Sequence, residues 1–128
     1  MWNAKPKPND EKLVLAVDDD PSVRESMSIL IDAKSYSVLQ AENGQIALDV
    51  LKKMPHCPCL IVLDLAMPVM DGRGFLKQRA LDPILRDIPV VVVSGNVCEV
   101  PLEGIDAYLC KPVKVERLIE VIDQHCSG

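Results

Sequence analysis

Polar side chains able to do chemistry follow four short apolar runs of this sequence. Asp18 and Asp19 come after the first run, and Asp64, Ser94 and Lys111 each follow a later one. Each has an ordinary structural explanation when taken alone, because an aspartate after a strand often caps a helix and a lysine is usually solvated. The carboxyl ends of parallel strands, however, meet at one edge of a sheet, where ligands bind. We therefore expect these side chains to form one site.

Three carboxylates in such a site would repel one another and could not all stay ionised without a counter-charge. Hard oxygen ligands with no histidine or cysteine beside them favour Mg²⁺, which also takes phosphoryl oxygens as ligands. A carboxylate can be a nucleophile toward phosphorus. Lys111 would then neutralise the oxygens of the transferred group, and Ser94 would donate a hydrogen bond to one of them. The residues predict magnesium-dependent phosphoryl chemistry.

The elements that must position these residues follow from the apolar pattern. Short apolar runs predict strands over residues 13–17, 38–41, 60–63, 90–93 and 107–110, and helical spacing of apolar residues separates most of them. Asp20 and Pro21 are suited to the cap and first position of the first helix, and Asn43 with Gly44 opens the second. Alternating strands and helices predict an α/β fold with a parallel sheet covered on both faces.

Size and charge limit the function. The 128 residues are enough for one domain, and 48% hydrophobic residues are enough for one core. A net charge of −5 removes the general attraction of a basic domain to nucleic acid or anionic lipid. We expect residues 1–11 to be a flexible lead-in, residues 12–126 to be the folded domain, and the location to be cytoplasmic, because neither a signal peptide nor an apolar run of about 20 residues is evident.

The five cysteines, at positions 57, 59, 98, 110 and 126, lie largely on or beside apolar segments. An odd number in this arrangement favours reduced, structural thiols over a disulfide framework. His56, Cys57 and Cys59, together with His125 and Cys126, could supply soft metal ligands. Their spacing matches no zinc pattern, so buried thiols remain the favoured interpretation.

Four motifs in order carry a resemblance to a known family. They are Val17-Asp18-Asp19-Asp20-Pro21, then Leu63-Asp64 followed by Met67-Pro68-Val69-Met70-Asp71-Gly72, then Ser94-Gly95, then Tyr108 with Lys111-Pro112. Over residues 12–124 the chain resembles the response-regulator receiver domain of two-component phosphorelays. The resemblance implies a flavodoxin-like strand order 2-1-3-4-5 with helices on both faces. It also implies a phosphoacceptor that takes its phosphoryl group from a histidine kinase or histidine phosphotransfer protein, a timed switch rather than a metabolic enzyme.

The resemblance also implies a role for each residue. Asp64 would be the phosphoacceptor. Asp18 and Asp19 would hold Mg²⁺ directly or through water, together with Asp64 and the backbone carbonyl of Ala66.

Ser94 would contact the phosphoryl group, Lys111 would pair with its oxygens, and Tyr108 would be the switch aromatic that changes rotamer as Ser94 moves. Gly95 would leave the site accessible to water and to a donor, and a cis peptide would precede Pro112.

One departure from the family concerns the segment between Ser94 and Lys111, which is several residues shorter than usual and contains Pro101 and Gly104. The fourth helix is therefore expected to be short, distorted or absent. In the family this helix belongs to the output face. We expect the signal to pass by contact with a separate effector or a fused output domain, and the sequence leaves a homodimer open.

Other functions compete with this interpretation. Asp18-Asp19-Asp20 contains the Asp-x-Asp of haloacid-dehalogenase-like phosphatases, in which Asp18 would be the nucleophile, but those enzymes normally carry a cap or a larger core. A degenerate receiver could act as a docking or dimerisation module without phosphorylation, but it would have lost the acidic pair, the acceptor or the lysine. A flavodoxin-like binder would need a loop that presents amides to phosphate, which three aspartates would repel.

Overall fold

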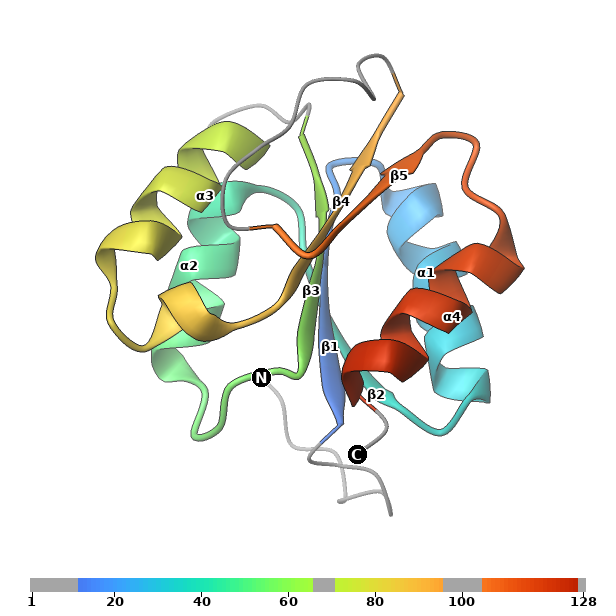
Figure 1. The fold of residues 1–128 in the computed structure, drawn as a ribbon, viewed down its shortest axis with the longest axis horizontal. Helices are drawn as coiled ribbons and strands as arrows, with labels where there is room; N and C mark the ends of the chain where they lie inside the picture. The colour runs from blue at the N-terminus through green and yellow to red at the C-terminus, as the bar shows by residue number, and fades with distance from the viewer. Residues whose placement is uncertain (1–11, 66–70, 96–104, 127–128) are drawn as a thin grey trace.

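The computed structural model describes residues 12–65, 71–95 and 105–126 (Figure 1). Five parallel strands form one sheet in the order β2-β1-β3-β4-β5. The strands are β1 (Leu13–Val17), β2 (Ser37–Ala41), β3 (Leu60–Asp64), β4 (Val90–Ser94) and β5 (Ala107–Cys110). The helices are α1 (Pro21–Ala33), α2 (Gly44–Lys53), α3 (Gly72–Leu81) and α4 (Val115–Cys126), with a short 3₁₀ helix η1 (Leu85–Asp87) before β4.

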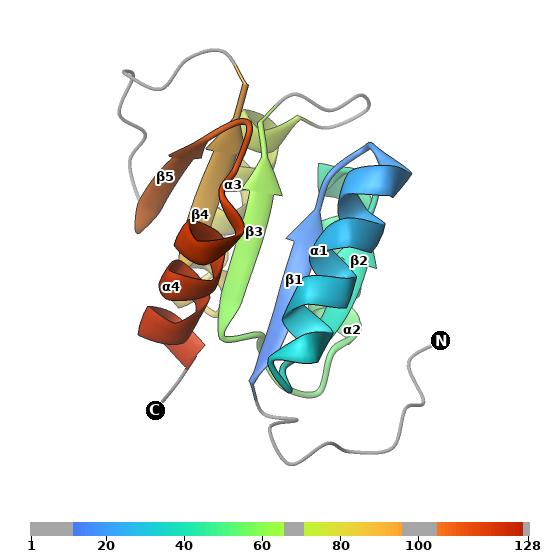
Figure 2. The same cartoon turned by 90° about the vertical axis from the view of Figure 1, so that its right-hand side faces the viewer.

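The helices cover both faces of the sheet. Figures 1 and 2 show α1 and α4 on one face and α2 and α3 on the other. Each face buries its own apolar cluster, so the strands between them are almost continuously apolar, as a parallel sheet requires. The predicted doubly wound α/β fold, with strand order 2-1-3-4-5 and helices on both faces, is confirmed.

Side-chain caps begin the first three helices. An Asp20 side-chain oxygen accepts a hydrogen bond from the Ser22 amide, with Pro in the first turn of α1, as the sequence predicted. The Asn43 side chain accepts one from the Ile46 amide at the start of α2. The Asp71 side chain accepts one from the Gly74 amide at the start of α3. These local bonds satisfy amides that the helices leave open, and so fix where each helix starts.

Several sequence expectations fall outside the described residues. They concern the lead-in at residues 1–11, the carbonyl of Ala66, and the segment that contains Pro101 and Gly104, where the fourth helix of the family was expected to be short or distorted. Among the residues that the structure does describe, none of the helices is long and apolar enough to cross a membrane.

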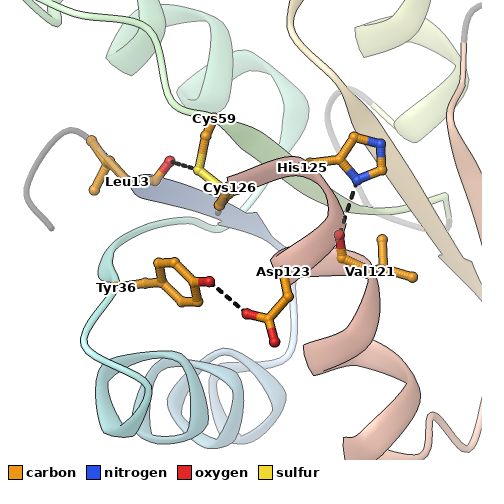
Figure 3. The surroundings of a disulfide bond; sticks show 7 residues. All are labelled: Leu13, Tyr36, Cys59, Val121, Asp123, His125 and Cys126. Carbon is orange, nitrogen blue, oxygen red and sulfur yellow. Dashed lines mark hydrogen bonds between the residues drawn. A yellow bond between two sulfur atoms is a disulfide. The ribbon is translucent and has the colours of Figure 1, made fainter. Parts of the chain in front are cut away.

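The expectation of reduced cysteines is wrong. Cys59, just before β3, and Cys126, the last residue of α4, form a disulfide (Figure 3). Cys110 is also disulfide-bonded, and Cys57 is a free, exposed thiol. The sequence could not reveal the Cys59–Cys126 pair, because its members lie 67 positions apart and meet only when α4 packs back across the sheet, with a Cα–Cα distance of 5.4 Å.

The sequence also raised His125 as a possible metal ligand beside Cys59 and Cys126, and the structure shows which groups it contacts instead. His125 Nδ1 lies 2.9 Å from the Val121 carbonyl oxygen, and Figure 3 shows the ring turned away from the two sulfurs. His125 Nε2 lies 3.9 Å from an Asp106 carboxylate oxygen.

Tyr36 connects the α1–β2 turn to α4. Its buried hydroxyl donates a hydrogen bond of 2.5 Å to Asp123 Oδ1 (Figure 3). Burial, followed by the hydrogen bond and the charge of Asp123, raises the pKa of Tyr36 from 10.0 to about 12. The unfolded chain thus loses the tyrosine proton at lower pH than the folded chain does.

This raised pKa predicts a loss of stability in alkali. The contribution of Tyr36 is fully present below pH 10.0 and is lost as the pH rises through about 12. It amounts to about 3 kcal/mol, since the pKa shift is about two units and one unit corresponds to about 1.4 kcal/mol. Urea unfolding at several pH values should show a steeper decline between these limits for the natural chain than for Tyr36→Phe. Parallel declines in the two proteins would contradict the assignment.

Candidate functional site

The expected polar residues meet at the carboxyl edge of the sheet. Asp18 follows β1, Asp64 ends β3, Ser94 ends β4 and Lys111 follows β5. Asp18, Asp19 and Asp64 each offer a carboxylate oxygen, and these oxygens all lie within 4.8 Å of one another. The structure therefore brings Asp18, Asp19, Asp64 and Lys111 together, and it places Ser94 at the end of β4 beside β5.

Lys111 is the cation beside the two buried carboxylates. Its Nζ lies 3.5 Å from Asp18 Oδ2 and 3.6 Å from Asp64 Oδ2, and the side chains of the two aspartates are only 2% and 7% exposed. One ammonium group cannot balance two buried carboxylates and the exposed Asp19 beside them. The site therefore keeps excess negative charge, which suits a divalent cation with oxygen ligands.

Hydrogen bonds to the side chain, the amide and the carbonyl oxygen of Asp18 hold this residue in place. Its Oδ1 accepts a hydrogen bond of 2.9 Å from the Asp20 amide, and its own amide donates one of 3.1 Å to the Ala41 carbonyl. Arg24 Nη1 donates to the Asp18 carbonyl at 2.7 Å, while its Nε donates to the Gln40 side chain at 3.2 Å. The carboxylate is thus oriented by the first turn of α1 and by β2.

Sequence reasoning missed Arg24 and Gln40. An arginine on the first turn of a helix and a glutamine near a strand end both look like solvated surface residues. Arg24 and Gln40 meet next to Asp18 only because α1 packs beside β2.

The ends of β4 and β5 bring the backbones of Ser94 and Lys111 side by side. The Lys111 amide donates a hydrogen bond of 2.8 Å to the Ser94 carbonyl, and the peptide between Lys111 and Pro112 is cis, as the resemblance implied. Gly95 is exposed, and among the described residues a Cβ there would meet nothing closer than Lys111 Cδ at 4.0 Å. Half-buried Tyr108 lies on β5 and packs against the core beneath α2 and α3.

A cavity of about 640 Å³ opens from this site along the face of α1 and α4 shown in Figure 2. Its polar end is formed by Asp18, Asp64 and Lys111. The rest of the wall is mostly apolar and includes Met27 and Leu30 of α1 and Leu118 of α4. The cavity thus joins the acidic site to the apolar surface between α1 and α4.

Residues 14–123 match the family described as the response regulator receiver domain, and the chain belongs to this family. It is a phosphoacceptor signalling domain of two-component systems, as the resemblance implied.

The similarity extends over most of the chain. The polar-differentiation response regulator DivK of Brucella anthropi is 33% identical over 119 residues, which cover 89% of this chain and 95% of DivK. The probable transcriptional regulator ycf27 of Porphyra purpurea is 33% identical over 115 residues, which cover 86% of this chain but 45% of ycf27. The crystal structure of the receiver domain of a signal transduction histidine kinase from Syntrophus aciditrophicus superposes with a TM-score of 0.81 at 28% identity and covers 91% of each chain.

Proposed function

We propose that Asp64 accepts a phosphoryl group from the phosphohistidine of a sensor histidine kinase or histidine phosphotransfer protein. The observation that carries this proposal is the position of Asp64, buried beside Asp18, Asp19 and Lys111 at the open edge of the sheet. The chain spans less than half of ycf27, so the output of that longer regulator is not transferred to this domain.

The residues present fit Mg²⁺. Three carboxylates offer hard oxygen atoms within 4.8 Å of one another, and Lys111 Nζ lies 3.5 Å from one of them, Asp18. Asp18, Asp19 and Asp64 would hold the ion, together with the Ala66 carbonyl that the resemblance implies. Bound there, the ion would supply positive charge to the phosphoryl oxygens.

Three residues of the chain take part in the transfer of the phosphoryl group. A carboxylate oxygen of Asp64 forms the new bond to phosphorus as the bond from phosphorus to the donor imidazole nitrogen breaks. Lys111 pairs with an oxygen of the transferred group, and the Ser94 hydroxyl donates a hydrogen bond to another. Hydrolysis by water later returns Asp64 to its carboxylate and releases inorganic phosphate.

The remaining roles belong to the same proposal. Tyr108 changes rotamer as Ser94 moves toward the phosphoryl group, and partner contacts change with it. The domain spans residues 12–126 after a lead-in at residues 1–11, acts in the cytoplasm, and turns over no metabolite. A separate effector or a fused output domain receives the signal.

Intact mass measurement tests the proposal. The natural chain is incubated with acetyl phosphate, a small acyl phosphate donor, with Mg²⁺ or with a chelator in its place. We expect a gain of one phosphoryl group that requires Mg²⁺. A chain that gains no phosphoryl group from acetyl phosphate or from a phosphorylated histidine protein would support the docking module instead.

Lys111→Met is expected to slow labelling by roughly 10²-fold, the usual effect of removing one group that stabilises developing charge. The same substitution should tighten Mg²⁺ binding, because the ammonium group that pairs with Asp18 and Asp64 no longer competes with the ion. Labelling rates and calorimetric titration with Mg²⁺ measure the two effects. Lys114→Met is the matched control, since Lys114 is exposed just before α4. Equal labelling rates in both variants would contradict the role of Lys111.

A further inference from the structure

The disulfide lies at the opposite edge of the sheet from the acidic site. Cys59 directly precedes β3, and Cys126 is the last residue of α4 (Figure 3). The bond ties the final turn of α4 to the amino end of the central strand. None of the residues of the acidic cluster takes part in it.

The surroundings of Cys59 and Cys126 suit the two reduced thiols as well as the disulfide. The Cys59 amide donates a hydrogen bond of 2.8 Å to the Leu13 carbonyl oxygen, and the Cys59 sulfur lies 3.4 Å from the same oxygen. A reduced Cys59 thiol therefore has an acceptor in place. Cys126 is 4% exposed among apolar residues, where a free thiol packs as a small hydrophobe. Neither sulfur atom is therefore left in an unfavourable environment when the disulfide is reduced.

Other contacts hold α4 when the bond is broken. Leu118, Val121 and Ile122 are buried against the sheet, and the Tyr36 hydroxyl donates to Asp123. The disulfide is therefore an additional restraint on a helix that is already docked.

We propose that Cys59 and Cys126 form a reversible redox modification site that exchanges with low-molecular-weight disulfides of the glutathione class. This inference is independent of the proposed phosphoacceptor function. The half-buried Cys59 is the more accessible of the two, so its thiolate attacks the glutathione disulfide and one glutathione thiolate leaves. The Cys126 thiolate then displaces the second glutathione from Cys59. The two protein thiols lose two electrons and two protons, and one glutathione disulfide becomes two glutathione thiols.

The expected consequence is a change in thermal stability without a change in phosphoryl chemistry. A bond between residues 67 positions apart restricts the unfolded chain strongly. The linked form should melt about 10 °C above the form in which this bond is reduced, the order of magnitude for a loop of this length in a domain of this size. Labelling of Asp64 should be the same in both forms.

The experiment equilibrates the full chain in buffers of decreasing glutathione to glutathione disulfide ratio, then traps free thiols with an alkylating reagent in acid. Peptide mapping measures the linked fraction of Cys59–Cys126 separately from the bond made by Cys110. We expect this fraction to rise with oxidant, to fall again after return to reducing buffer, and to track the melting temperature.

Two variants serve as controls. Cys57→Ser removes the exposed free thiol two positions away and should leave the linked fraction and its melting shift unchanged. Cys126→Ala should lack the part of the melting shift that follows the Cys59–Cys126 fraction, and should keep any part due to the bond made by Cys110. The proposal is overturned if Cys59 and Cys126 of the natural chain stay unlinked in oxidising buffer, or if the melting temperature does not follow their linked fraction. Because these two outcomes compare the natural chain with itself, a poorly folding variant does not decide the result.

Discussion

Asp64→Asn is expected to reduce labelling of the chain by acetyl phosphate to background. The amide that replaces the carboxylate is a poor nucleophile toward phosphorus and carries no charge with which to hold Mg²⁺. In the proposed mechanism Asp64 is the acceptor while Asp18 and Asp19 hold the metal ion, so neither neighbouring carboxylate is expected to replace it. Intact mass after incubation with Mg²⁺, followed by peptide mapping of the natural chain, measures the effect.

The fold should survive this substitution. The aspartate lies within 4.8 Å of two other carboxylates, so removing its charge relieves repulsion. The melting temperature of Asp64→Asn is therefore expected to equal or exceed that of the natural chain. Asp49→Asn, which neutralises an exposed carboxylate on α2, is the matched control and should label normally. If Asp64→Asn still labels and Asp18→Asn does not, the phosphohydrolase interpretation replaces the receiver mechanism.

Gly72→Ala is expected to destabilise the domain by about 2 kcal/mol. A Cβ at Gly72 would lie 2.6 Å from Leu65 Cα and 2.7 Å from the Asp64 carbonyl oxygen. Both are backbone atoms, which cannot rotate away as a side chain could. Overpacking of this kind costs about 1–3 kcal/mol and here outweighs the up to about 1 kcal/mol that Ala gains over Gly in a helix. Urea unfolding measures the change as a lower midpoint.

Gly95→Ala is the matched control for this prediction. Among the described residues, the atom nearest to its Cβ would be Lys111 Cδ, 4.0 Å away. We expect its stability to stay within about 0.5 kcal/mol of the natural chain. If Gly72→Ala unfolds at the same urea concentration as Gly95→Ala, the close approach of α3 to the end of β3 is not rigid.

Much of the fold was predictable because it rests on local chemistry. The apolar run before Asp18 predicted a buried strand, and the structure places all five residues of β1 in the interior. Asp20 and Asn43 predicted two helix starts because capping bonds join residues only two or three positions apart. The acidic cluster was predictable as well, since parallel strands bring their carboxyl ends to one edge.

The sequence by itself determined the strands, the starts of α1 and α2, and the meeting of Asp18, Asp64 and Lys111, because strand–helix alternation leaves few topologies open. Only the tertiary structure decided which cysteines pair, why Gly72 has no room for a side chain, and how Arg24 supports the Asp18 loop. Each of these last features depends on distances across packed elements. Composition and spacing constrain such distances weakly, because one apolar pattern is compatible with many side-chain packings.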